Sequence, residues 1–384
     1  MLRKWWQSPQ LISARSKDRK ISWLEVFSDL IYVIIFHSLT VGLMRETSIL
    51  NTGKFLLLYL LIYWTWSEFN FYFDSHGDTS LRTTTLSVLQ MAAIALATVY
   101  IPAFYESHFT SFILAFALNQ LMITYLWWGS GHFDPQHYQY AHDHNRQYWI
   151  ALGLELVAVV VPNQQIQILL LILAIVLNYS AGWFARKAAK AEFEQRHLEF
   201  TISPALSERY SQLMMIVMGE SLAGLIDSMS EVNKTWETLL LFFVSAFLTL
   251  LIYLLFYINF DHLIPKNGYG WMYLYRESFI VIILNAVLEI LFIHQMLFDP
   301  SKTTQLMLAI TTVIMVLIMV LLPIWMGAGR KPDCWIWETG VKVAGLALIL
   351  LALLVSFTWS IILITVGMGA IVAVEAIYQI DLNN

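Results

Sequence analysis

The chain has 384 residues, of which 58% are hydrophobic and only 13% are charged, whereas about a quarter of the residues of a soluble domain are charged. This composition excludes an ordinary soluble globular protein and favours an integral membrane protein. The net charge of -5 and the single cysteine, Cys334, argue against a nucleic-acid partner, an intramolecular disulfide and a cysteine-based metal or redox centre.

Residues 1–22 form a basic tail with six Lys and Arg residues. No small-residue cleavage site follows the first apolar run, so the tail is predicted to be a retained cytoplasmic segment and not a cleaved signal peptide.

Apolar segments long enough to cross a bilayer follow this tail, since a spanning helix needs about 20 apolar residues. The first six lie at 23–44, 54–73, 82–103, 108–129, 147–161 and 165–185. The second six lie at 206–227, 236–260, 276–298, 303–326, 339–357 and 359–380. The pattern predicts an all-α membrane protein with about twelve transmembrane helices, in which residues 23–185 and 206–380 form two halves joined by a cytoplasmic linker at 186–205. Only a few residues near Thr358 separate the last two spans.

The basic residues predict the orientation. With twelve spans and the N-terminus inside, 18 of the 22 Lys and Arg residues fall on the cytoplasmic side, and only Arg45, Lys54, Lys234 and Lys302 fall on the other. Lys and Arg collect in cytoplasmic loops, so both termini are expected in the cytoplasm.

The two halves share a weak internal repeat. Shifting the chain by 183 residues aligns 23–39 with 206–222 and gives five identical pairs. They are Glu25 with Glu208, Ser28 with Ser211, Leu30 with Leu213, Ser38 with Ser221, and Leu39 with Leu222. Because six spans separate the copies, the halves are predicted to be parallel repeats, as in some transporters.

A polar stripe marks the first helix of each half. Glu25, Asp29 and His37 are spaced by four and eight residues and therefore share one helical face. Glu208, Gln212 and Glu220 repeat this spacing. Ionisable groups in a span cost about 2.5 to 3.5 kcal/mol each near the midplane, so these faces are expected to contact protein or water and to supply solute- or ion-binding groups.

The members of the stripe differ in depth. Glu25 and Glu208 lie near helix ends, where they are either first-turn carboxylates favoured by the helix dipole or binding groups. Asp29 lies one turn deeper and is a stronger candidate for a cation or proton. His37 and Glu220 occupy equivalent positions and form either a coupled acid–base pair across the repeat axis or a structural pair.

Two further carboxylates, Glu155 and Glu289, interrupt otherwise apolar runs and join the candidate binding residues. The loop His132–His144 contains four His and two Asp residues. It could supply metal ligands, but a solvated loop is the simpler interpretation, and no helical His-Glu-x-x-His pattern occurs. We therefore expect no metal, no cofactor and no catalytic residue.

Three motifs carry a resemblance to a known family. Ser22-Trp-Leu-Glu-Val-Phe-Ser-Asp-Leu30 resembles the opening motif of the bacterial low temperature requirement protein A family, and Phe73-Asp74 with Asp78 and Arg82 is similar to its second motif. Ser207-Glu-Arg-Tyr and Ile216-Val-Met-Gly-Glu-Ser-Leu222 resemble its middle motif. Ser28 stands where the family has Phe, and Tyr275-Arg276 stands where His is commoner.

The resemblance implies a multi-pass protein of the bacterial inner membrane, named for growth in the cold, without a settled substrate. By analogy it ranks seven positions first for testing. They are Glu25, Asp29, Glu208, Arg209, Gly219, Glu220 and Ser221.

Two functions compete at this point. Parallel halves with ionisable stripes predict a proton- or cation-coupled transporter or permease of an unknown small solute. The alternative is a membrane sensor or scaffold that supports growth at low temperature through partner proteins or lipids, without transport. An enzyme would need a convergent nucleophile or metal site, which these residues do not form.

Overall fold

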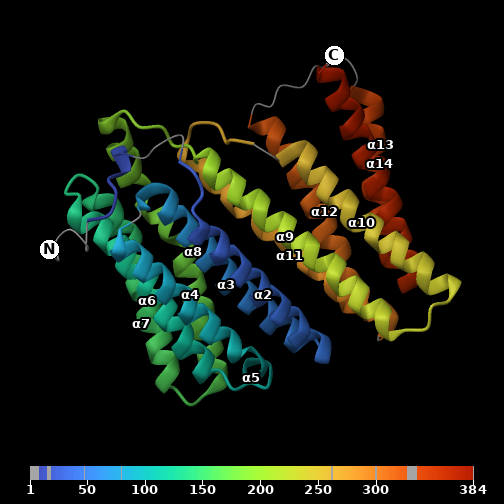
Figure 1. Cartoon of the computed structure of the whole chain (residues 1–384), viewed down its shortest axis with the longest axis horizontal. Helices are drawn as coiled ribbons and strands as arrows, with labels where there is room; N and C mark the ends of the chain where they lie inside the picture. Colours follow the sequence, from blue (N-terminus) through green and yellow to red (C-terminus); the bar gives the residue numbers. More distant parts are fainter. Residues whose placement is uncertain are drawn as a thin grey trace. The chain divides into compact units, whose positions relative to one another are not determined.

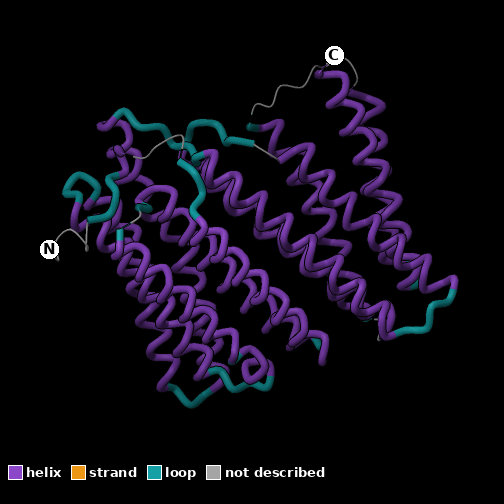
Figure 2. The backbone as a smooth tube through the Cα atoms, viewed as in Figure 1, coloured by secondary structure: helices purple, strands orange, loops and turns teal. Residues whose placement is uncertain are grey.

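The computed structural model describes residues 8–14, 19–46, 48–78, 80–260, 263–298, 301–326 and 335–383. Cys334 and the start of the basic tail lie outside these residues. Within them, every regular element is helical, as Figure 2 shows in purple.

The helices follow one another with short connections (Figure 1). The N-terminal series comprises η1 (Ile12–Ala14), α2 (Trp23–Arg45), α3 (Ile49–His76), α4 (Leu81–Val99), α5 (Ile101–Tyr105), α6 (Thr110–Phe133), α7 (Tyr138–Val160) and α8 (Gln164–Arg196). The C-terminal series comprises α9 (Pro204–Glu231), α10 (Trp236–Phe260), α11 (Tyr269–Phe298), α12 (Lys302–Trp325), α13 (Trp335–Leu351), η3 (Ala352–Leu354) and α14 (Phe357–Asn383).

Each of the twelve predicted spans overlaps a helix, although the span 82–103 is divided between α4 and α5 and the span 339–357 extends beyond α13. Ten helices of the described chain are long and apolar enough to cross a membrane. The other two, α3 and α7, are more polar: α3 carries Lys54, Glu68 and Asp74, and the first half of α7 carries several His, Asn and Gln residues. Their polar side chains are largely buried within the protein. The protein is therefore an all-α, multi-pass membrane protein, and about twelve spans are consistent with its helices.

The chain divides into two compact units. Unit one comprises Met1–Gly42, Leu50–Arg209 and Lys266–Tyr273, and unit two comprises Leu43–Ile49, Tyr210–Pro265 and Leu274–Asn384. The predicted parallel relation between two six-helix halves stays a prediction.

Unit one is built on neighbouring helices that follow one another in sequence, with α4 beside α6, α6 beside α7 and α7 beside α8. Polar residues mark the start of two of them. Ser80 accepts a hydrogen bond from the Thr83 amide at α4, and Asn163 accepts bonds from two amides at α8, as N-cap residues do. The fully buried Trp127 of α6 contacts the rings of Tyr72 and His144.

In unit two, α14 packs against α10 and α13. Gly345 of α13 and Gly367 of α14 let two backbones approach closely, because a Cβ atom added at Gly345 would lie 2.7 Å from the Gly367 carbonyl oxygen. Small residues serve this purpose between membrane helices. The connection between α13 and α14 passes through η3 and Val355, slightly before the expected turn near Thr358, and the last two spans are separate helices.

Candidate functional site

The candidate site begins at the N-terminus of α2, where Ser22 and Glu25 form a capping box. The Glu25 amide donates to Ser22 Oγ at 3.3 Å, and the Ser22 amide donates to Glu25 Oε1 at 3.1 Å. This reciprocal pair satisfies amides that the first helical turn would leave unbonded. It also fixes the Glu25 carboxylate, which Arg19 Nη1 approaches at 2.8 and 2.9 Å.

One turn further along α2, the fully buried Asp29 receives three hydrogen bonds. Trp66 Nε1 of α3 donates to Asp29 Oδ1 at 2.7 Å. Arg209 of α9 donates from Nη2 to Oδ1 at 2.7 Å and from Nε to Oδ2 at 3.2 Å. The planar guanidinium thus binds the carboxylate through both of its oxygens, which is the strong form of this ion pair.

Arg209 also reaches the capping box. Its Nη1 donates to Glu25 Oε2 at 3.2 Å, and its Nη2 donates to the Glu25 carbonyl oxygen at 2.9 Å. Asp74, at the end of α3, bonds the amide and hydroxyl of Ser203 just before α9 and lies 4.0 Å from Arg19 Nε. We call Arg19, Glu25, Asp29, Asp74 and Arg209 the arginine cluster.

The arginine cluster joins the start of α2, the end of α3 and the first turns of α9 through bonds among almost fully buried groups. Arg209 and Asp29 are 0% exposed and Glu25 is 2% exposed. A buried ion pair is not by itself strong evidence for stability. Removing one partner, however, leaves a buried charge without a counterion and lowers the free energy of unfolding by about 3 to 5 kcal/mol. In this arrangement each oxygen of Asp29 already accepts at least one hydrogen bond and Arg209 balances its charge, so the cluster acts first as a fixed electrostatic connection between helices.

A second set of buried polar groups continues along α2 from Asp29. The Tyr32 and Thr65 hydroxyls lie 3.0 Å apart, and Gln90 Nε2 donates to Tyr32 Oη at 2.6 Å and to Asn119 Oδ1 at 2.8 Å. These bonds connect α2, α3, α4 and α6. They place a continuous row of polar groups inside unit one, where lipid-facing positions could not hold them.

Glu155 of α7 differs from all of these groups. It is 0% exposed, and neither carboxyl oxygen meets a hydrogen-bond partner among the described residues. An isolated carboxylate in such surroundings is very costly, so the group is expected to carry its proton. A protonated carboxyl that no cation neutralises is suited to binding and releasing a proton.

Glu289 of α11, in unit two, is also fully buried. Its Oε1 accepts a hydrogen bond from the Thr249 hydroxyl at 2.8 Å, whereas Oε2 has no partner among the described residues. One turn earlier on α11, Asn285 donates to the Thr311 and Thr312 hydroxyls of α12 at 3.1 and 2.8 Å. The Asn285 side chain therefore links α11 to α12, whereas the Glu289 carboxyl group, like that of Glu155, has no cationic partner among the described residues.

The remaining stripe residues are more open. His37 and Glu208 are exposed, and Gln212 and Glu220 are partly exposed. None of them joins the arginine cluster through a contact described above. The predicted meeting of His37 with Glu220 stays a prediction.

The interpretation of His132–His144 as a solvated loop is wrong for two of its four histidines. His137 lies between α6 and α7 and His144 lies within α7, and both are buried and take part in ion pairs and ring contacts. His137 Nδ1 lies 3.0 Å from both oxygens of Glu192, whose charge Arg196 offsets while also binding Asp134 at 2.9 Å. Burial lowers the pKa of His137 to about 4, although Asp134 opposes this shift. At neutral pH the imidazole is therefore uncharged, and burial raises the pKa of its partner Glu192 to about 7, so a hydrogen bond joins Nδ1 to the Glu192 carboxyl group in either direction. Within the described residues, no group of three or more His, Cys, Asp and Glu side chains could hold a metal ion.

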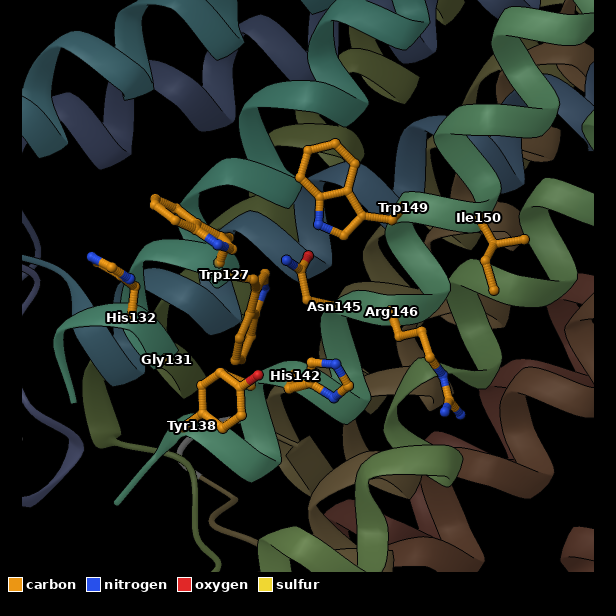
Figure 3. Close-up of a pocket in the computed structure, with 11 residues that line it drawn as sticks. Trp127, Gly131, His132, Tyr138, His142, Asn145, Arg146, Trp149 and Ile150 are labelled. Carbon is orange, nitrogen blue, oxygen red and sulfur yellow. The ribbon is translucent and has the colours of Figure 1, made fainter. Parts of the chain in front are cut away.

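A cavity of about 360 Å³ lies between α6 and α7. Figure 3 shows aromatic and polar side chains around it, with His132 and Arg146 on opposite sides. Trp127, Tyr138, His142, Asn145 and Trp149 complete much of its wall. The cavity is a separate place for a small molecule, apart from the arginine cluster.

Sequence reasoning did not find every group that the structure assembles. Trp66 lies in the middle of α3, whereas the tryptophans that signal membrane interfaces lie at segment ends, and Arg19 belongs to a tail without periodicity. Their contacts with Asp29 and Glu25 depend on tertiary structure. Arg209 was singled out only by the family resemblance.

Comparison with known proteins gives one family. No curated protein and no solved structure matches the chain. The family described as "Bacterial low temperature requirement A protein (LtrA)" matches residues 20–373, which includes Glu155, Glu289 and every member of the arginine cluster except Arg19. The chain therefore belongs to the bacterial low temperature requirement A protein family.

Proposed function

We propose that the protein is a proton-coupled permease of a small solute, in which Glu155 carries the coupled proton. The observation that carries this proposal is the complete burial of Glu155 without a partner for either oxygen among the described residues. Such a carboxyl can ionise only when its surroundings change, because ionisation needs water or a cation nearby. Loss of its proton is thereby linked to a change of conformation.

The same observation favours a proton over a metal cation as the coupling ion. Hard cations are held by several oxygen ligands at once, whereas the Glu155 oxygens have no hydrogen-bond partner among the described residues, and no group of three or more His, Cys, Asp and Glu side chains there could hold a metal ion. Glu289, with one hydroxyl partner and one free oxygen, is the second proton-carrying group. The arginine cluster supplies a fixed frame, since both oxygens of Asp29 are already hydrogen-bonded and Arg209 balances its charge.

The experiment uses the purified protein in liposomes that enclose a pH-sensitive dye. A panel of small solutes is added outside, and proton uptake into the vesicles is recorded for wild type, Glu155→Gln and Glu194→Gln. Glu194 is an exposed glutamate of α8 and controls for the loss of one carboxylate. We expect solute-dependent proton uptake in wild type and Glu194→Gln and none in Glu155→Gln, because glutamine mimics the protonated form permanently. Equal proton uptake in Glu155→Gln would overturn the proposal.

A membrane sensor or scaffold is the second candidate. The bonds from Arg209 to the carboxylates of Glu25 and Asp29 favour it, because such a connection stabilises one conformation without a ligand. This candidate predicts that no solute in the panel drives proton uptake, and that the folded protein restores growth in the cold even when it carries Glu155→Gln.

A further inference from the structure

Arg82, in the first turn of α4, is a buried arginine without a carboxylate partner. It is 1% exposed, and its one hydrogen bond runs from Nη2 to the Tyr72 hydroxyl at 3.3 Å. Nε and Nη1 meet no acceptor among the described residues. Most of the five N–H groups of this guanidinium are therefore not bonded to the described chain.

Other buried arginines of unit one are treated differently. Arg209 binds Asp29 and Glu25, and Arg196 binds Asp134 and lies 3.2 Å from Glu192. Each of these guanidinium groups is thus balanced by two carboxylates, as buried charges require. Arg82 is as deeply buried as Arg209, but no carboxylate balances its charge.

The local helix adds to the positive charge. Ser80 caps α4, so Arg82 occupies the second position of the helix, where the dipole is positive and favours an anion over a cation. Asp78 is the acidic residue four positions earlier, but its Oδ1 accepts from the Ser80 amide at 3.0 Å and the Ser80 hydroxyl at 2.6 Å. It forms no ion pair with Arg82.

The guanidinium is also held in place. A Cβ atom added at Gly129 of α6 would lie 3.1 Å from Arg82 Nη1, so the missing side chain at this position lets the guanidinium lie against α6. On its other side Tyr72 of α3 accepts the Nη2 bond. A fixed, planar group with unused donors is the arrangement that binds oxygen pairs of carboxylates and phosphates.

We propose that Arg82, with the N-terminal turn of α4, binds a small oxyanion such as phosphate, sulfate or a carboxylate. The unused Nε and Nη1 donors lie on different edges of the guanidinium, so one of them, together with the second N–H of Nη2, holds two oxygens of the anion, and the charge of the anion replaces the missing carboxylate. The site does not require transport, because it rests only on the contacts of Arg82.

The test measures thermal unfolding of the full-length purified protein during titration with sodium phosphate, sodium sulfate or sodium acetate, against sodium chloride at equal ionic strength. A ligand that binds the folded state raises the melting temperature in a saturable way. We compare wild type with Arg82→Gln, Arg82→Lys and the control Arg186→Gln, which removes an exposed arginine of α8.

At least one oxyanion should stabilise wild type and Arg186→Gln saturably and leave Arg82→Gln unchanged. Lysine keeps the positive charge but lacks the paired N–H donors of the guanidinium. Half-maximal stabilisation of Arg82→Lys should therefore need at least about tenfold more anion, which corresponds to a loss of about 1.4 kcal/mol of binding free energy. If Arg82→Gln does not fold, Gly129→Ala replaces it, since its methyl group displaces Nη1 and should weaken the response. Identical titrations for wild type and the Arg82 or Gly129 variant, or no saturable response of folded wild type to any oxyanion, would overturn the proposal.

Discussion

Replacing Arg209 by glutamine should destabilise the protein strongly, because no other residue of the arginine cluster binds both Asp29 and Glu25. The substitution removes four hydrogen bonds of 2.7 to 3.2 Å. Glu25 keeps Arg19 at 2.8 Å, but the fully buried Asp29 keeps only the Trp66 N–H. The buried carboxylate at Asp29 is then left without a cation.

The size of the stability loss follows from the unpaired charge of Asp29. Breaking one side of a buried ion pair costs about 3 to 5 kcal/mol, a large fraction of the 5 to 15 kcal/mol by which folded proteins are typically stable. At about 2 to 4 °C per kcal/mol, the melting temperature should fall by about 6 to 20 °C, with the lower part of this range expected for a chain of this length.

The assay is thermal unfolding in detergent, with Arg146→Gln as the matched control. Removal of this exposed arginine should change stability by no more than about 0.5 kcal/mol. The double variant Asp29→Leu with Arg209→Met removes both charges and should recover much of the loss, because apolar replacements of buried ion pairs are often neutral. Arg209→Gln melting together with the control, or the double variant melting lower than Arg209→Gln, would refute this reasoning.

Three further predictions use the same measurement. Trp66→Phe removes the 2.7 Å bond to the Asp29 carboxylate and should cost about 1.5 to 3 kcal/mol, whereas unchanged melting would show that Arg209 alone satisfies Asp29. Gly345→Leu should separate α13 from α14, since even a Cβ would lie 2.7 Å from the facing carbonyl oxygen, and overpacking costs about 1 to 3 kcal/mol; a melting temperature equal to that of wild type would contradict this close approach. The pKa of His137 is lowered from its usual value near 6.5 to about 4, and the pKa of its partner Glu192 is raised from 4.5 to about 7. As the pH falls through this range the histidine destabilises the folded protein and the glutamate stabilises it, by up to about 3 kcal/mol each, so the two effects oppose one another. His137→Gln removes only the first effect and should raise the melting temperature near pH 4.5 relative to its value at neutral pH, and a pH profile equal to that of wild type would contradict this assignment.

The amino-acid sequence predicted the helices more completely than the site. Long apolar runs identify spans directly, and even the more polar α3 and α7 fell on predicted segments. The chain reversal before α14 came slightly earlier than expected because η3 and Val355 make the connection and not the residues around Thr358.

For the site, charge inside an apolar helix was the useful signal. It singled out Glu25, Asp29 and Glu155, which are all buried. It could not distinguish the bonded Asp29 from the unpartnered Glu155, since that difference depends on which side chains of other helices meet each carboxyl. Trp66 illustrates the same limit, because nothing in its local sequence indicates a bond to Asp29.

The most direct test of the account is the protonation state of Glu155, which can be measured without a known solute. Infrared difference spectra between wild type and Glu155→Gln in lipid at neutral pH report whether the carboxyl group carries a proton, with Glu194→Gln as the exposed control. The account predicts a protonated-acid carbonyl band that Glu155→Gln removes and Glu194→Gln retains. A carboxylate band lost in Glu155→Gln, with no change in the protonated-acid region, would contradict the role of Glu155 as the proton-carrying group.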